Sequence, residues 1–276
     1  MSHSFCPSTI FRQLLRVLAL PVILFLIPAS GFSQQPFVTD DSDVTPKGHF
    51  HFEFSNEFDW LQRDSFPSLK QNTADFELDY GLFERLELGF EVPMLTIFSE
   101  VGTQQRSVSG IGDANISLKY NFLKERENSR RPALAIALNL ELPTGDAGRR
   151  LGSGLADFYI NGILQKSVTQ KTKLRLNGGI LFSGNETTGV LGIRSRGTVF
   201  TTGGSLVRQF TEKLQLGAEL TGAVSKNLDL GKSQLQVLVG GNYQVSQKIS
   251  FDFAFLSGKH VASPRAGVQL GISVDF

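Results

Sequence analysis

Carboxylate side chains recur at every second position in several short stretches of this chain, and the first stretch contains Glu53, Glu57 and Asp59. Residues at this spacing lie on one face of a β-strand. If several strands place their acidic faces around one lumen, the resulting rings of carboxylates favour cations and repel anions. Alternatively, these side chains only fill an interior, paired with water and with the few basic residues. The pattern leaves both interpretations open.

The charged residues that fit this inward-facing pattern are mostly acidic, so a shared lumen would have a negative bias. We predict as lumen-facing Glu53, Glu57, Asp75, Glu77, Asp79, Glu87, Glu91, Asp113, Lys119, Glu141, Asp157, Arg175, Glu219, Asp252 and Arg265.

Three residues of the first stretch could bind a metal. His49, His51 and Glu53 fall on one face at two-residue steps, and imidazole with carboxylate suits a transition metal. No ligand from another strand can be placed beside them, and His260 falls in a predicted loop. Because a metal site needs a full set of ligands, we predict none here.

The acidic residues Asp40, Asp41 and Asp43 precede the first predicted strand and could attract calcium. They lack the glycine and the terminal glutamate of a calcium-binding loop. We therefore predict a solvated periplasmic lead-in at residues 34–48.

Nucleophilic catalysis would need a serine beside a histidine that a third group orients. The three histidines after residue 33 lie near strand ends or in loops, and no serine beside them has this setting. The glycines around residues 110–112 and 152–154 open predicted strands, whereas a dinucleotide-binding fingerprint opens a helix. We predict no catalytic residues, no enzyme activity and no cofactor.

The elements that must position the acidic residues are β-strands. In residues 133–142, leucine and isoleucine alternate with alanine, asparagine and glutamate, which is a period of two. The same alternation recurs along the chain, and residues 50–60 show it clearly. It predicts about twelve strands of about ten residues each. Only residues 198–210 have faces too similar for us to assign the buried side.

The predicted connections alternate in length. Those at 81–85, 168–172 and 245–248 are short, whereas those at 95–109 and 143–153 are longer. Bacterial outer-membrane barrels have short periplasmic turns at one rim and longer loops at the other. A soluble β-sandwich or barrel also alternates apolar with polar residues. Here the bulky apolar rows run the full strand length, which favours lipid outside and a polar lumen inside.

Composition excludes some functions and indicates export. The 276 residues have a net charge of +1 and no clustered basic face, so we expect no nucleic-acid partner. Arg12 and Arg16 precede an apolar run that small residues follow, which is typical of a cleaved signal peptide at residues 1–33. The lone Cys6 lies before that run, which argues against a lipoprotein anchor.

Four segments follow a pattern found in one protein family: PFVTDDSDVTPKGHFHFE, DFELDYGLFERLELGFEVP, SGIGDANISLKYNF and LELPTGDAGRRLGSGLADF. The last contains the most specific element, Pro143, Thr144, Gly145 and Asp146. These segments resemble the MetA-pathway phenol-degradation family of outer-membrane proteins. They cover the N-terminal half of the predicted mature chain, and beyond residue 165 only the strand pattern is similar. The resemblance implies an outer-membrane β-barrel that transports small compounds, with aromatic compounds among the candidates.

We therefore expect an all-β fold, with residues 49–276 forming a single antiparallel up-and-down transmembrane β-barrel of about twelve strands. We expect it in the bacterial outer membrane, surrounded by lipid and inserted by the barrel-assembly machinery. Phe276 ends an alternating apolar strand and resembles the signal that this machinery recognises. The expected function is passive passage of small solutes, aromatic or hydrophobic compounds among them. The alternative is a non-conducting barrel with a structural or surface-binding role.

Overall fold

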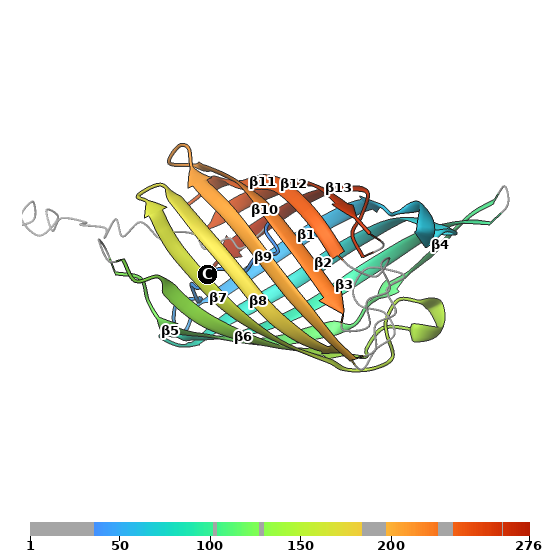
Figure 1. The fold of residues 1–276 in the computed structure, drawn as a ribbon, viewed down its shortest axis with the longest axis horizontal. Coiled ribbons are helices and arrows are strands. Elements are labelled where there is room, and N and C mark those ends of the chain that lie inside the picture. The colour runs from blue at the N-terminus through green and yellow to red at the C-terminus, as the bar shows by residue number, and fades with distance from the viewer. Residues whose placement is uncertain (1–35, 102–103, 127–129, 184–196, 226–233, 261) are drawn as a thin grey trace, which may run out of the picture. The chain divides into compact units, whose positions relative to one another are not determined.

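The computed structural model describes residues 36–101, 104–126, 130–183, 197–225, 234–260 and 262–276, which form a β-barrel (Figure 1). The strands are β1 (Phe50–Trp60), β2 (Ser68–Phe83), β3 (Leu86–Val101), β4 (Gln104–Ile111), β5 (Ala114–Leu123), β6 (Ala133–Leu142), β7 (Asp157–Thr169), β8 (Thr172–Ser183), β9 (Gly197–Gln209), β10 (Leu214–Ser225), β11 (Gln234–Ser246), β12 (Ile249–Lys259) and β13 (Ala266–Asp275). Two short 3-10 helices, η1 (Arg63–Ser65) and η2 (Ala147–Arg149), lie in connections. The described residues include no helix of the length and apolarity needed to span a bilayer. The predicted signal peptide lies outside the described residues.

All strands except β4 form a closed antiparallel ring. The first and last strands pair along their length, from His51 with Asp275 to Trp60 with Ala266, and β3 pairs with both β2 and β5. Each remaining strand pairs with its neighbours in chain order. The expected antiparallel up-and-down barrel of about twelve strands is confirmed.

The connection expected at residues 95–109 is largely a β-hairpin. β3 continues to Val101 and returns as β4, which pairs only with the outer part of β3. The hairpin extends past the ends of the other strands (Figure 1). A hydrogen bond of 2.9 Å joins the hydroxyls of Thr96 and Ser109. Because this hairpin carries polar residues on both sides, its sequence lacks the alternation that marks the barrel strands.

The two faces of the sheet have the polarity of a membrane barrel. Outward-facing Phe255 and Leu270 are 68% and 66% exposed, whereas inward-facing His51 and Glu53 are only 3% and 2% exposed. A water-soluble barrel buries its apolar face, but this barrel presents that face to its surroundings. The arrangement of apolar residues outside and polar residues inside is therefore as predicted.

The structure shows which face of β9 points inward, a question that the sequence left open. Phe200 and Leu206 are exposed on the outer surface, whereas Ser205 and Val207 point inward and are buried. Val207 belongs to an apolar cluster inside the barrel, formed by Phe37, Val207, Leu238, Ala254 and Leu256. Both faces of β9 therefore carry apolar residues, which is why its alternation is weak.

Phe37 reaches this cluster because residues 36–45, here called the plug segment, run inside the barrel. All of them except Val38, Asp40 and Asp43 are buried, so the prediction of a solvated lead-in is wrong for these residues. The chain passes from the plug segment to β1 at the rim of short turns, against Gly81. A side chain at Gly81 would meet the Pro46 carbonyl oxygen at 2.1 Å, so only glycine permits this close approach.

Candidate functional site

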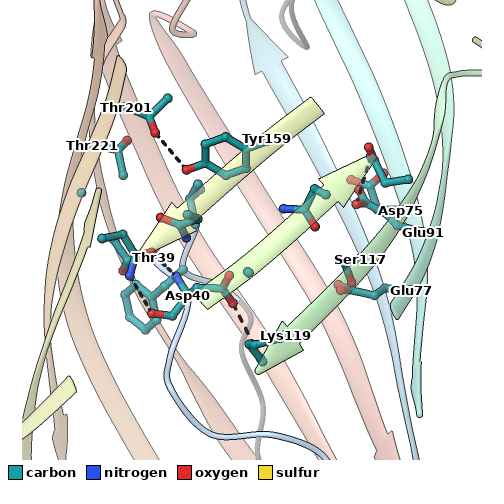
Figure 2. Close-up of a pocket in the computed structure, with 18 of the residues that line it drawn as sticks. Thr39, Asp40, Asp75, Glu77, Glu91, Ser117, Lys119, Tyr159, Thr201 and Thr221 are labelled. Carbon is teal, nitrogen blue, oxygen red and sulfur yellow. Dashed lines mark hydrogen bonds and ion pairs between the residues drawn. The ribbon is translucent and has the colours of Figure 1, made fainter. Parts of the chain in front are cut away.

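The barrel contains a cavity of about 620 Å³ (Figure 2). Residues of the plug segment form part of its wall, and the inner faces of the strands form the rest. The charged residues that line it are Asp40, Glu53, Glu57, Asp75, Glu77, Asp79, Glu87, Glu91, Lys119, Glu141 and Asp157. Among the described residues, Lys119 is the one basic residue in this lining. The cavity therefore has a wall rich in carboxyl groups.

Ten of the fifteen residues predicted as lumen-facing line this cavity: Glu53, Glu57, Asp75, Glu77, Asp79, Glu87, Glu91, Lys119, Glu141 and Asp157. The other five lie elsewhere. Arg175 and Glu219 contact the plug segment, Asp252 accepts a hydrogen bond from Ser273, and Asp113 binds an outer loop. Arg265 is exposed.

The prediction that Arg265 faces the lumen is wrong. Its position has the parity of the inward row of β13, but that strand begins only at Ala266. The carbonyl of Arg265 accepts a hydrogen bond from the Ser257 hydroxyl at 2.8 Å, and its N–H donates to the Trp60 carbonyl at 2.8 Å. Alternation along a strand does not continue into the connection that precedes it.

A buried ion pair fixes the middle of the plug segment. Arg175 Nη2 on β8 lies 3.1 Å from Asp41 Oδ2, and both side chains are 4% exposed. A second, more exposed pair lies nearby, with Lys173 Nζ 3.4 Å from Asp43 Oδ2. Loss of one partner of the first pair would leave a buried charge without its counter-ion, so the segment should depend more on this pair than on the second.

Backbone groups of the plug segment are satisfied by side chains of the barrel wall. The carboxylate of Glu219 accepts hydrogen bonds from the backbone N–H groups of Val38 at 3.1 Å and Thr39 at 2.5 Å. The Asp40 N–H donates to Asn177 Oδ1 at 2.6 Å, and the Asn177 amide donates back to the Asp40 carbonyl at 3.0 Å. Buried backbone groups that no strand pairs with need such partners. The wall is therefore built to accept this extended segment.

Lys119 connects the plug segment with the acidic wall. Its Nζ lies 3.0 Å from Glu87 Oε1 and 3.8 Å from Asp40 Oδ1, and Figure 2 shows it directed toward Asp40. Glu87 also accepts a hydrogen bond of 2.5 Å from the Thr45 N–H. The only basic residue in the described cavity lining is thus occupied by two carboxylates.

Replacing Arg175 with methionine should release the plug segment. The substitution leaves Asp41 buried without its cation, and breaking a buried pair in this way costs about 3–5 kcal/mol. We expect the backbone amides of residues 37–45 to exchange hydrogen much faster in Arg175→Met than in the parent protein, as measured by mass spectrometry. Lys173→Met is the matched control, because an exposed pair contributes only about 0–1 kcal/mol. Equal exchange in both variants would contradict this role of Arg175.

His51 is engaged on both sides of its ring. Nδ1 lies 2.6 Å from Asp275 Oδ1, and Nε2 lies 2.8 Å from Glu53 Oε1. A metal ligand needs a ring nitrogen that is free to coordinate, and here carboxylates occupy both. His49 is exposed at the rim. Among the described residues, no group of three or more His, Cys, Asp or Glu has a geometry that could hold a metal ion.

The sequence was compared with models of known protein families. The model of the family described as the MetA-pathway of phenol degradation matches residues 35–276. The chain belongs to this family. The match extends through the C-terminal strands, beyond the N-terminal segments on which the resemblance rests in the sequence. It also includes the plug segment, so family membership covers both the barrel and the segment inside it.

Solved structures with the same fold include outer-membrane channels and porins. An outer-membrane channel from Pseudomonas putida F1 has a TM-score of 0.67 at 16% identity, covering 86% of this chain and 98% of that chain. The KdgM porin in complex with disordered oligogalacturonate has a TM-score of 0.56 at 10% identity, covering 82% and 99%. The NanC porin has a TM-score of 0.55 at 8% identity, covering 81% and 98%. A search of curated proteins gave no match.

The family motif Pro143, Thr144, Gly145 and Asp146 lies in the connection between β6 and β7, where it organises the loop. Thr144 Oγ1 donates to the Gly112 carbonyl at 2.9 Å and accepts from the Ala114 N–H at 2.9 Å. Asp146 Oδ1 accepts a hydrogen bond of 3.1 Å from the N–H of Arg149 in η2. Pro143, Thr144 and Asp146 are exposed.

Asp113 holds this loop against the start of β5. Its two carboxylate oxygens accept hydrogen bonds from the N–H groups of Gly145 at 2.8 Å and Ser153 at 2.6 Å. A side chain at Gly145 would lie 2.5 Å from the Leu151 carbonyl oxygen, and one at Gly152 would lie 2.5 Å from Asp113. The two glycine-containing segments, around residues 110–112 and 152–154, therefore meet at Asp113.

The substitution Asp113→Ala should open this loop. It removes the acceptor for two half-buried N–H groups, and hydrogen bonds to a charged group contribute about 1.5–3 kcal/mol each. Arg149 and Arg150 lie in the loop, so we expect trypsin to cleave there severalfold faster in the variant. Asp252→Asn changes a buried carboxylate elsewhere in the barrel and serves as the control. Unchanged cleavage of the Asp113 variant would show that the loop does not depend on these hydrogen bonds.

The sequence did not show which residues bind the plug segment. Glu219 and Arg175 were predicted as inward-facing, but nothing in the alternation showed what they face. The segment itself carries no strand pattern. The one available signal was the resemblance at residues 36–53, because a family pattern outside any strand indicates a structured segment.

Proposed function

We propose that this protein is a bacterial outer-membrane channel for the passive passage of small solutes, and that the plug segment controls how open its lumen is. The observation that carries the proposal is the polar cavity of about 620 Å³ inside the barrel, with the plug segment as one wall. A barrel of twelve strands lies between filled eight-stranded barrels and open sixteen-stranded porins. Its conductance should therefore depend on what occupies the lumen.

The contacts of the plug segment support a movable element. Apart from the apolar cluster around Phe37, it is held by ion pairs and hydrogen bonds, such as those of Asp41 and Thr39. Water can replace polar contacts of this kind when the segment leaves the wall. The shared fold with outer-membrane channels and porins agrees with a channel, and the family description motivates aromatic or hydrophobic compounds as candidate solutes.

A non-conducting barrel is the second candidate. The observation that favours it is the close fit of the plug segment, whose backbone groups at Val38, Thr39, Asp40 and Thr45 all bond to wall side chains. In that case the plug segment would be a permanent filling, and the exposed connections would carry the function.

Planar bilayers and liposomes distinguish these candidates. We expect the purified mature protein to give single-channel currents and to admit small neutral solutes into liposomes in swelling assays. Heat-modifiable migration on a gel serves as the control for a folded barrel. Folded protein that neither conducts nor admits any solute would overturn the channel and favour the second candidate.

The proposal also places the protein in the outer membrane after cleavage of residues 1–33. Membrane fractionation and the intact mass of the purified protein test this directly. We expect the protein in the outer-membrane fraction, with the mass of a chain that begins at Gln34. Recovery with residues 1–33 attached would contradict removal of a signal peptide.

A further inference from the structure

One row of residues crosses the acidic wall of the cavity from strand to strand. Its members are directly opposed in the sheet register: Glu53, Glu77, Glu91, Asn115, Glu141 and Asp157, from β1, β2, β3, β5, β6 and β7. All six line the cavity. The row therefore places five carboxyl groups on six neighbouring strands, with Asn115 between Glu91 and Glu141.

Like charges that face each other across neighbouring strands destabilise a sheet. Glu77 stands directly opposite both Glu53 and Glu91, and Glu141 stands opposite Asp157. Among the described residues, Glu77, Glu91 and Glu141 form no ion pair with a lysine, arginine or histidine. The middle of the row is thus a group of carboxyls with no basic partner among the described residues.

The basic groups nearest to this wall are already occupied. Lys119 contacts Glu87 and Asp40, and His51 lies between Glu53 and Asp275. Figure 2 shows Asp75 beside Glu91 on the wall, away from the contact of Lys119 with Asp40. Among the described residues, none supplies a further cation to balance the row, so a bound cation could take that place.

Two buried hydrogen-bond acceptors line the same cavity. Asn161 is 3% exposed and Thr221 is 8% exposed, and Asn161 Oδ1 and Thr221 Oγ1 have no hydrogen-bond partner in the described structure. Leaving a buried polar atom unpaired costs about 1–3 kcal/mol. A ligand with several N–H groups would satisfy these acceptors together with the carboxylates. They are an observation separate from the acidic row, and they indicate the same kind of ligand.

The dimensions of the site favour an organic cation over a bare metal ion. A volume of about 620 Å³ is in the range of small-molecule sites, which span about 300–1,000 Å³. The row spreads its carboxylates at the strand spacing of about 4.8 Å, whereas a metal site gathers its ligands around one point. No such gathering of three or more His, Cys, Asp or Glu occurs in the described part of the chain.

Tyr159 adds an aromatic surface beside the row. A side chain at Gly179 would lie 2.5 Å from the Tyr159 ring, so the glycine leaves room for the ring to lie against the wall. The Tyr159 hydroxyl is 2.9 Å from Thr201 Oγ1, as Figure 2 shows. Cations are attracted to the face of an aromatic ring, and the methylene groups of an organic cation can pack on it.

We propose that this cavity binds linear organic amines in their protonated form, with ammonium groups along the row from Glu77 to Asp157 and N–H donors directed to Asn161 and Thr221. This inference adds protonated amines to the candidate solutes of the proposed channel, and it rests on that function for the route by which the amine enters. Binding in the cavity can nevertheless be measured without any passage.

Equilibrium binding of spermidine to the purified, folded mature protein, measured by isothermal titration calorimetry, tests the proposal. We expect saturable binding that Glu91→Gln and Glu141→Gln each weaken about tenfold or more, as expected for loss of a hydrogen bond to a charged group. These variants keep the side-chain shape and reduce charge repulsion, so they should fold. Asn161→Leu should weaken binding without changing the charge. Asp252→Asn, an inward carboxylate outside the cavity lining, should bind as the parent does.

Three outcomes would overturn the proposal. They are the absence of spermidine binding, equal binding by the parent and both glutamine variants, and displacement of spermidine by magnesium at equal charge concentration, which would indicate a diffuse cation atmosphere. Bilayer and swelling experiments on the same preparations separate this inference from the channel. Binding without conductance would retain the amine site and reject the channel, whereas conductance without binding would do the reverse.

Discussion

Deleting residues 36–45 should raise the single-channel conductance severalfold. The plug segment occupies the lumen and is bonded to Glu219, Asn177 and Arg175 on the wall. Its removal leaves these side chains facing water, where they can be solvated, and the closed ring of strands does not depend on it. Conductance of purified protein in planar bilayers is the measurement, with the deletion and the parent protein recorded in the same salt.

Heat-modifiable migration of the deletion variant shows whether the barrel still forms. The graded control is Arg175→Met, which should release the segment without removing it and should give transient openings of the same larger size. If the deletion variant is folded and its conductance equals that of the parent, the plug segment does not limit the lumen.

Deleting Phe276 should strongly reduce insertion of the barrel. Its N–H donates to the Phe50 carbonyl at 3.0 Å and its carbonyl accepts from the Phe50 N–H at 2.8 Å, so it closes the seam between β13 and β1. The two rings also stack, with centroids 5.8 Å apart. We expect the folded, heat-modifiable form in outer-membrane fractions to fall to a small part of the parent level.

Two substitutions separate the ring from the backbone. Phe276→Tyr keeps an aromatic ring and should insert as the parent does, whereas Phe276→Ala keeps the backbone bonds and should still insert poorly. Phe255→Ala removes an exposed outward ring from the middle of β12 and controls for general loss of apolar surface. Normal insertion of the deletion variant would reject Phe276 as an assembly signal.

Much of the barrel could be predicted because one physical constraint acts on every strand. Lipid outside and a polar lumen inside impose a period of two, so the alternation in β1 and β6 shows both strand positions and facing. The alternation weakens where a strand does not separate lipid from a polar lumen. β9 was ambiguous because its inner face meets Phe37 instead of water, and the hairpin of β3 and β4 was missed because it extends beyond the region in which lipid selects apolar residues.

The interior could be predicted only in part. The direction in which a side chain points follows from its own strand, whereas its contacts depend on residues far away in the sequence. Glu77 and Glu91 were assigned inward, but only the register shows that they are opposed. The ion pair of Arg175 with Asp41 joins residues 134 apart in the sequence, and no pattern in either segment predicts it. The prediction of a solvated lead-in was wrong for the same reason. The sequence alone does not distinguish an aspartate that pairs with a buried arginine from an aspartate in water.

A reversible lock on the plug segment tests the account most directly. Thr39 Oγ1 and Ser205 Oγ are 2.7 Å apart, so the substitutions Thr39→Cys and Ser205→Cys bring two thiols close enough for a disulfide, whose β-carbons lie about 3.5–4.5 Å apart. Single-channel conductance of this double variant would be recorded before and after addition of a reductant, with each single variant as control. We expect a low conductance in the oxidised state that rises on reduction, only in the double variant. Equal conductance in both states, with disulfide formation verified by mass spectrometry, would contradict a channel governed by the plug segment.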